Sequence, residues 1–449
     1  MRPATVFVCQ ACGAQSPKWL GRCPECGAWN SFVEERPTPA RGPGGTAPAA
    51  RSVGLGEVSP SPTERLGTGN PEVDRVLGGG LVAGGVVLLG GDPGVGKTTL
   101  VLQVLGHVAR SATVLYATGE ESLEQVAARA RRLGVGAPGL RLLAETSVEA
   151  VLEEVERLSP KVLAVDSIQT SASGALASAP GSLSQVRECA ARWIEAAKGR
   201  AMAALLVGHI TKEGLIAGPK ALEHMVDTVL YLEGERYRHL KALRAQKNRF
   251  GATSELALLE MTAGGLLPVE NPSAALLKDR PRGVPGTVIG VAVQGTRPLL
   301  VEIQALTSPS AFGVAKRMSA GLDRNRVQLL SAVLERALRV TLGDKDLFVN
   351  VVGGVELEEP ALDLPLCLAV ASTYYGKPLP PDLAAFGEVG LAGEVRGVGS
   401  VGERVREASA LGFTRGILPA SDLERLEDPP AGGAWRGVRS LAEVADLLF

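Results

Sequence analysis

Short, almost wholly apolar runs alternate with amphipathic stretches between residues 63 and 271 of the chain. Runs of five or six apolar residues are typical of strands buried on both faces of a parallel sheet. Stretches with apolar residues at helical spacing predict the helices that connect such strands. The alternation therefore predicts a doubly wound α/β domain with a mostly parallel sheet. Its expected strands cover residues 85–90, 113–118, 161–166 and 203–209.

A second folded region is expected after a Pro- and Gly-rich stretch from Asn271 to Gly286. This stretch also carries Lys278, Arg280 and Arg282, and we interpret it as a domain boundary. The pattern beyond it predicts a separate α+β domain over residues 285–449. The expected strands cover residues 287–293, 299–305 and 347–352, and the expected helices cover residues 323–338, 362–374 and 401–411.

The region before the α/β domain divides into two parts. Residues 34–62 are rich in Pro, Ala and Gly and have few large apolar side chains, which predicts a semi-flexible tether. Residues 1–33 then form a small N-terminal module, and the α/β domain is assigned to residues 63–272.

Composition narrows the class of protein. The chain has 449 residues, of which 45% are hydrophobic and 21% charged, as expected for a globular protein with several domains. The net charge is −1, so any nucleic-acid binding must come from local basic clusters. The sequence has no long, clean apolar run and no signal-peptide pattern, so we expect a cytoplasmic protein with no membrane contact.

A phosphate-binding loop follows the first expected strand. The pattern G-x-x-x-x-G-K-[ST] lets backbone N–H groups surround an anion, places Lys97 at the β- and γ-phosphates and gives Mg²⁺ the Thr98 hydroxyl. A plain Gly-rich turn is the alternative, but a strand before the loop and a helix after it favour ATP binding. The nucleotide-binding residues are Gly91, Asp92, Pro93, Gly94, Val95, Gly96, Lys97, Thr98 and Thr99.

Acidic residues at the ends of two further strands suggest hydrolysis. Asp166 ends an apolar strand, where it can support Mg²⁺ opposite Thr98. Glu120 is our candidate for the carboxylate that polarises the attacking water, with Glu121 as a lesser candidate. Both glutamates can instead be ordinary acids at a helix start. His209 can sense the γ-phosphate or serve as a structural histidine.

Two pairs of cysteines in the N-terminal module have the spacing of a metal site. Cys9 and Cys12 form one C-x-x-C turn, and Cys23 and Cys26 form the other. Thiols stay reduced in the cytosol, so four thiolates on two tight turns predict tetrahedral Zn²⁺, with a redox pair as the alternative. The basic and aromatic residues near them can form a docking face or the module's core: Lys18, Trp19, Arg22 and Trp29.

Three strings carry a resemblance to a known family. Residues 66–70 and 77–81, followed by the phosphate loop, resemble the RecA/KaiC/DnaB branch of ATPases. The string KNRFG at residues 247–251 resembles the signature of the bacterial RadA (Sms) family of DNA repair proteins. The resemblance covers essentially the whole chain. It implies a RecA-like ATPase core, a four-cysteine zinc ribbon and a C-terminal Lon-protease-like domain.

The resemblance also implies an activity. Members of such a family are expected to form a ring, here a hexamer, and to hydrolyse ATP while they translocate on single-stranded DNA and promote branch migration. The implied partners are single-stranded and branched DNA, with RecA recombinase or a replicative helicase as a protein partner. A KaiC-like ATPase switch that does not translocate is the alternative.

Roles for four basic residues follow from the same resemblance. Lys247 and Arg249 would reach the transferring phosphoryl group of a neighbouring subunit, where such cations stabilise charge in the transition state. Lys212 and Lys220 lie in a Gly-rich segment whose place resembles the DNA-gripping channel loop of RecA-like proteins. A solvated hairpin and an ordinary surface loop are the respective alternatives.

The Lon-like domain lacks the peptidase residues. Lon proteases use a Ser nucleophile activated by a Lys. Ala361 stands where the serine would be, and Gly402 stands near the expected lysine. We therefore expect the fold without proteolysis, serving assembly and DNA binding. An ATP-dependent protease with an unrecognised nucleophile is the alternative.

Overall fold

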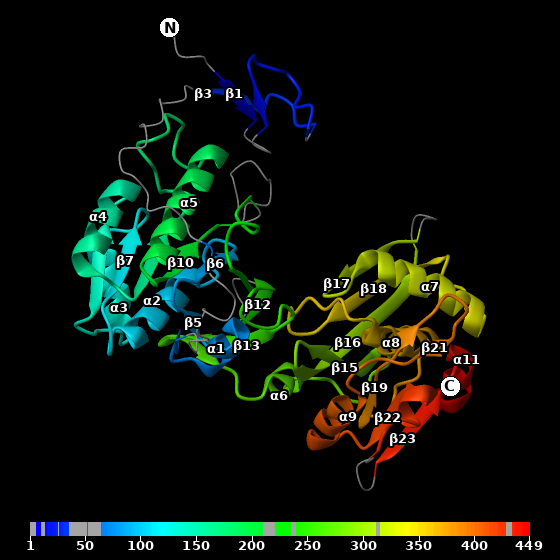
Figure 1. Ribbon diagram of the computed structural model, residues 1–449. Helices are drawn as coiled ribbons and strands as arrows, with labels where there is room; N and C mark the ends of the chain where they lie inside the picture. The colour runs from blue at the N-terminus through cyan, green and yellow to red at the C-terminus, as the bar shows by residue number, and fades with distance from the viewer. Residues whose placement is uncertain are drawn as a thin grey trace. The chain divides into compact units, whose positions relative to one another are not determined.

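A computed structural model of the chain describes residues 6–9, 14–25, 27–35, 52, 64–209, 221–234, 239–310, 315–427 and 433–449 (Figure 1). The chain divides into two compact units, Met1–Pro268 and Val269–Phe449. The division comes before the stretch expected as a boundary, because α6 (Pro272–Leu277) packs on β16 (Arg297–Pro309) of the second unit. Within the described residues, no helix is both long and apolar enough to cross a bilayer.

The first unit contains a nine-stranded sheet in the order β14-β13-β12-β11-β6-β10-β9-β7-β8. Neighbouring strands from β11 to β8 are parallel, and β12, β13 and β14 continue the sheet in antiparallel fashion. The four expected strands are confirmed as β6, β7, β9 and β10. The strands are β6 (Val86–Gly91), β7 (Val114–Thr118), β8 (Leu140–Ala144), β9 (Val162–Asp166), β10 (Ala203–Val207), β11 (Thr228–Glu233), β12 (Leu240–Asn248), β13 (Leu256–Thr262) and β14 (Gly265–Pro268).

Helices cover both faces of this sheet. One apolar core contains buried residues of α1, α2 and α3, and a second core contains those of α4 and α5, including Cys189. Serines set the starts of α3, α4 and α5, because Ser122, Ser147 and Ser182 each accept a backbone N–H from three residues ahead. The remaining elements are α1 (Pro71–Leu77), α2 (Lys97–Val108), α3 (Leu123–Arg132), α4 (Val148–Leu158), α5 (Leu183–Gly199) and the short pair β4 (Arg65–Leu66) and β5 (Leu81–Val82).

The N-terminal module is a small three-stranded antiparallel sheet of β1 (Val6–Cys9), β2 (Gln15–Ser16) and β3 (Phe32–Glu35). Its described core consists of Cys9, Cys23 and Phe32. Trp19 and Trp29 are 52% and 71% exposed. Of the two alternatives that the sequence left open for these tryptophans, the core of the module is therefore wrong.

The second unit is an α+β fold around a seven-stranded sheet in the order β17-β18-β16-β15-β19-β22-β23. Helix α8 packs on β15 and β16, and the expected helices near residues 323, 362 and 401 are confirmed as α7, α8 and α9. The elements are β15 (Thr287–Gln294), β17 (Arg317–Ala320), α7 (Arg324–Leu338), β18 (Lys345–Val351), the 3₁₀ turn η3 (Pro360–Leu362), α8 (Asp363–Tyr375), β19 (Leu383–Ala385), β20 (Glu388–Val389), β21 (Val395–Arg396), α9 (Val401–Ala410), β22 (Arg415–Pro419), α10 (Ala420–Leu423), β23 (Ala434–Val438) and α11 (Leu441–Leu448).

Candidate active site

The predicted phosphate loop joins the end of β6 to the start of α2. Gly94 and Gly96 have φ of 81° and 119°, a region that favours glycine. A Cβ on Gly91 would lie 2.5 Å from the Leu232 carbonyl oxygen, so the loop also needs glycine for close packing. Gly96 gives α2 no side-chain cap, which leaves the first N–H groups of this helix available to an anion.

Lys97 is buried at the centre of the loop. Its Nζ donates to the carbonyl oxygens of Gly91 at 2.8 Å and Asp92 at 3.0 Å, and lies 3.0 Å from His209 Nδ1. Burial lowers the pKa of the ammonium, while Asp166, Glu120 and Asp92 oppose that shift. The cation therefore sits among acceptors that can be exchanged for phosphate oxygens.

Asp166 lies at the end of β9 and is buried, as a carboxylate supporting Mg²⁺ should be. Its Oδ2 accepts from the hydroxyls of Thr98 and Tyr116, each at 2.7 Å. Its Oδ1 is buried and has no hydrogen-bond partner among the described residues. A hydroxyl and an unsatisfied carboxylate oxygen are the hard oxygen donors that Mg²⁺ and its waters prefer, so these residues fit the ion.

Tyr116 was missed in the sequence. It sits in the middle of β7 and is fully buried, and both burial and Asp166 raise the pKa of its phenol. The signal was an aromatic hydroxyl between apolar residues of a buried strand, since a buried tyrosine hydroxyl usually needs a partner.

Glu120 is brought to Lys97 through His209. The Lys97 ammonium can only donate, so His209 Nδ1 accepts; the Nε2 proton then points at Glu120 Oε1, 3.0 Å away. Ser167 also donates to Glu120. The hydrogen bond from His209 is the main cause that lowers the pKa of Glu120, and Ser167 adds to it against burial.

Glu121 faces a different partner. Its carboxylate forms an ion pair with Arg129 of α3. Ligand atoms of Glu120, Asp166 and His209, by contrast, all lie within 4.8 Å of one another. The geometry thus favours Glu120 over Glu121 as the hydrolytic carboxylate.

The two cations of the KNRFG string differ in their surroundings. Lys247 Nζ donates to the carbonyl oxygens of Glu223 and Val226 at 2.7 and 2.8 Å. The Arg249 side chain is 56% exposed and lies 3.3 Å from Asp227. Arg249 is the more available of the two.

Asp227 connects this string to β6. Its Oδ2 accepts from the N–H of Val86, the first residue of β6, at 3.1 Å. The phosphate loop leaves the other end of the same six-residue strand. At about 3.3 Å per residue, the ends of β6 are roughly 17 Å apart. Arg249 is therefore remote from the phosphate loop of its own chain.

The structure describes only two of the six remaining predicted residues, which are the four cysteines of the metal site and the two lysines of the DNA contact. Lys212 and Lys220 fall outside the described residues, as do Cys12 and Cys26. Cys9 and Cys23 are described and buried, and their N–H groups donate to the carbonyl oxygens of Ala14 and Ala28 at 2.8 Å. Each acceptor lies five residues after its cysteine, so the two described cysteines have equivalent backbone contacts.

The expected peptidase position contains no nucleophile. Ala361 is fully buried in η3, and Gly402 lies in the first turn of α9. The carboxylates two residues before and after Ala361 are both paired with arginines, Glu359 with Arg404 and Asp363 with Arg326.

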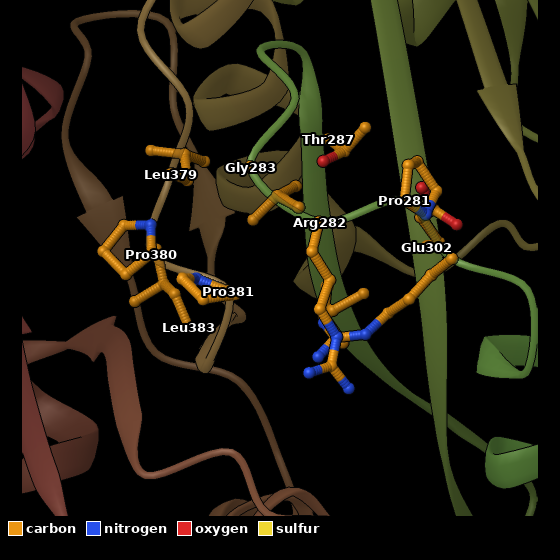
Figure 2. Close-up of a pocket in the computed structure, with 12 residues that line it drawn as sticks. Pro281, Arg282, Gly283, Thr287, Glu302, Leu379, Pro380, Pro381 and Leu383 are labelled. Carbon is orange, nitrogen blue, oxygen red and sulfur yellow. The ribbon is translucent and has the colours of Figure 1, made fainter.

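The basic stretch before β15 lines a small depression with Pro380 and Pro381 (Figure 2). Arg280 stacks over Phe413 at 4.7 Å, and burial raises the pKa of the neighbouring Glu302. The cavity measures about 20 Å³, little more than one water molecule occupies, so it is not a ligand site.

Comparisons with family models support the three-part organisation. Residues 7–34 match a rubredoxin metal binding domain, residues 55–214 match an AAA domain, and residues 328–434 match the Lon protease (S16) C-terminal proteolytic domain. These matches confirm the predicted fold class.

Several curated proteins resemble the whole chain. The DNA repair protein RadA of Bacillus subtilis is 47% identical over 98% of this chain and 97% of the relative. The RadA proteins of Pseudomonas aeruginosa and Streptococcus pyogenes are 49% and 46% identical, each over 99% of this chain and 98% of the relative. Among solved structures, a KaiC-like protein of Pyrococcus horikoshii covers 46% of this chain and is itself fully covered, at 19% identity and a TM-score of 0.38.

Proposed function

The chain belongs to the family of the DNA repair protein RadA, and on this premise we propose that it is a DNA-dependent ATPase that translocates on single-stranded DNA. Its role is to promote branch migration of recombination intermediates. Repair of DNA and hydrolysis of ATP are the properties of the family and of its ATPase domain. The motor activity is the proposal.

At the hydrolysis site, each residue has one proposed task. Lys97 would exchange its loop carbonyls for phosphate oxygens, and Thr98 and Asp166 would hold Mg²⁺, an ion that supplies neutralisation of phosphate charge. Glu120 accepts a proton from the attacking water and orients it. His209 touches both Lys97 and Glu120, so it can register whether a γ-phosphate has separated them.

The observation that carries the motor proposal is the distance between Arg249 and its own phosphate loop. The two lie at opposite ends of β6, so Arg249, supported by Lys247, can complete the site of an adjacent protomer. Sites that combine a loop from one copy with a cation from the next require a head-to-tail interface, which forms either a closed ring or an open filament. The resemblance to ring-forming ATPases favours the closed ring. We propose a hexamer.

DNA contact is assigned to the segment that follows His209. Lys212 and Lys220 would neutralise phosphates in the channel of the ring. The four-cysteine module, proposed to hold Zn²⁺, would contact RecA recombinase or a replicative helicase.

Unwinding of 5′- and 3′-tailed forks and of D-loops by the purified chain tests the proposal. ATP should support strand displacement, and a non-hydrolysable analogue should not. A Lys212→Ala/Lys220→Ala variant should show weaker DNA stimulation and a smaller salt dependence of binding, whereas Lys161→Ala, on the same domain, should not. Hydrolysis of ATP without displacement on any substrate would favour a KaiC-like switch instead.

A further inference from the structure

The C-terminal unit contains a cleft whose lining residues have no part in the roles expected for this unit, assembly and DNA binding. It measures about 420 Å³, within the range of ligand sites, and runs between α7, η3 and the start of α8. Apolar side chains supply much of the lining, and acidic side chains outnumber basic ones, with Arg326 as the cation among the lining residues. The apolar set is Leu322, Val327, Leu357, Leu362 and Leu366, and the acidic set is Asp323, Glu358, Glu359, Asp363 and Glu388.

Two of the acids are already committed to the wall. Glu359 pairs with the buried Arg404 and also accepts from the N–H of Val293 at 2.5 Å. Asp363 pairs with Arg326 and accepts from the N–H of Val389 at 3.1 Å. These bonds hold the chain in place on either side of Ala361, so this wall of the cleft is already formed before a ligand binds.

The other three acids give the cleft its charge. Asp323 and Glu358 are exposed, and Glu388 is half-buried. None of these carboxylates is offset by a second cation in the lining. A negative rim repels the phosphates of DNA and attracts ammonium or guanidinium groups.

We propose that this cleft binds an extended segment of a partner protein in which a basic residue stands beside an apolar one. The apolar side chain would enter the cleft, and the basic side chain would meet Asp323 and Glu358 at the rim. The segment would remain intact, because Ala361, between the lining residues Pro360 and Leu362, offers no nucleophile. This inference does not depend on translocation.

Fluorescence anisotropy on the full-length protein tests it with three labelled nonapeptides. One alternates Lys with Leu, one alternates Glu with Leu, and one alternates Lys with Ser. The Lys/Leu peptide should bind at least tenfold more tightly than either of the others. Only this peptide offers both a basic side chain to the acidic rim and an apolar side chain to the apolar lining. Unlabelled oligothymidylate should not displace it.

The variant Asp323→Asn/Glu358→Gln removes the two exposed charges of the rim, leaves Glu388 in place and keeps the cap of α7, since asparagine caps as well as aspartate. It should weaken Lys/Leu binding about fivefold. Glu403→Gln, an exposed acid of the same unit outside the cleft, is the matched control and should change nothing. Equal binding of the Lys/Ser peptide, equal loss in the control, or displacement by oligothymidylate would overturn the inference; the last result would assign the surface to nucleic acid.

Discussion

Mixing two inactive variants gives the sharpest test of a site shared between protomers. Lys97→Ala removes the cation at the centre of the phosphate loop but keeps Arg249. Arg249→Ala keeps the loop, which lies roughly 17 Å away along β6, and removes the cation offered to a neighbour. Each variant alone should lose about 10³-fold or more in ATP turnover.

The expected recovery follows from how the ring is assembled. Every seam takes its loop from one protomer and its arginine from the next. A working seam needs its phosphate loop from an Arg249→Ala protomer and its arginine from a Lys97→Ala protomer. In an equal mixture each position is filled correctly in half of the cases, so about a quarter of the seams work. If the seams work independently, the mixture should regain about a quarter of the wild-type turnover, measured as phosphate release after the variants have been unfolded and reassembled together.

Two controls identify the cause of the loss. Arg249→Lys keeps the charge without the planar fork and should recover only part of the activity. Arg244→Ala, on strand β12 that ends directly before Arg249, should turn over ATP normally. A mixture that stays at background although mixed oligomers form, or an Arg249→Ala protein that hydrolyses ATP at full rate, would refute the shared site.

Three further outcomes are expected. Tyr116→Phe removes one of two hydroxyls from the buried Asp166, so the ATPase domain should lose about 2 kcal/mol in stability in a urea titration, and an unchanged midpoint would contradict the contact. Because the pKa of Glu120 is held low by His209, the carboxylate stays ionised as pH falls; His209→Gln should raise that pKa and move the acid limb of the ATPase pH profile upward, and an unmoved limb would count against it. Cys9→Ser/Cys12→Ser should release zinc, measured by atomic absorption, without changing the melting of the ATPase domain, and retained zinc would exclude these thiols as ligands.

Much of the fold followed from local patterns. The strand before the phosphate loop and the helix after it were found because apolar runs and glycines act over a few neighbouring residues. The antiparallel strands β12 to β14 were not predicted, because their pairing depends on partners distant in the chain.

The site shows the same division. Thr98 and Asp166 were paired correctly because a motif and a strand end imply their meeting. The hydroxyls of Tyr116 and Ser167 were missed, because only the folded sheet shows which carboxylate each one faces. The ion pair between Glu121 and Arg129, which favours Glu120 as the candidate for the hydrolytic carboxylate, likewise depends on how α3 packs in the folded domain.

The hydrogen bond from Val86 to Asp227 has a mechanical consequence. Strand β6 is flanked by β10 and β11 along its length, so it behaves as a stiff rod that moves as one piece. One end of β6 is bonded to Asp227, which lies beside Arg249, the residue proposed to reach the neighbouring protomer. The other end of β6 continues into the phosphate loop of the same protomer. A force on Arg249 from the neighbouring protomer would therefore shift the phosphate loop of the protomer that carries this Arg249. ATP hydrolysis would then pass from one protomer to the next around the ring without a further moving element.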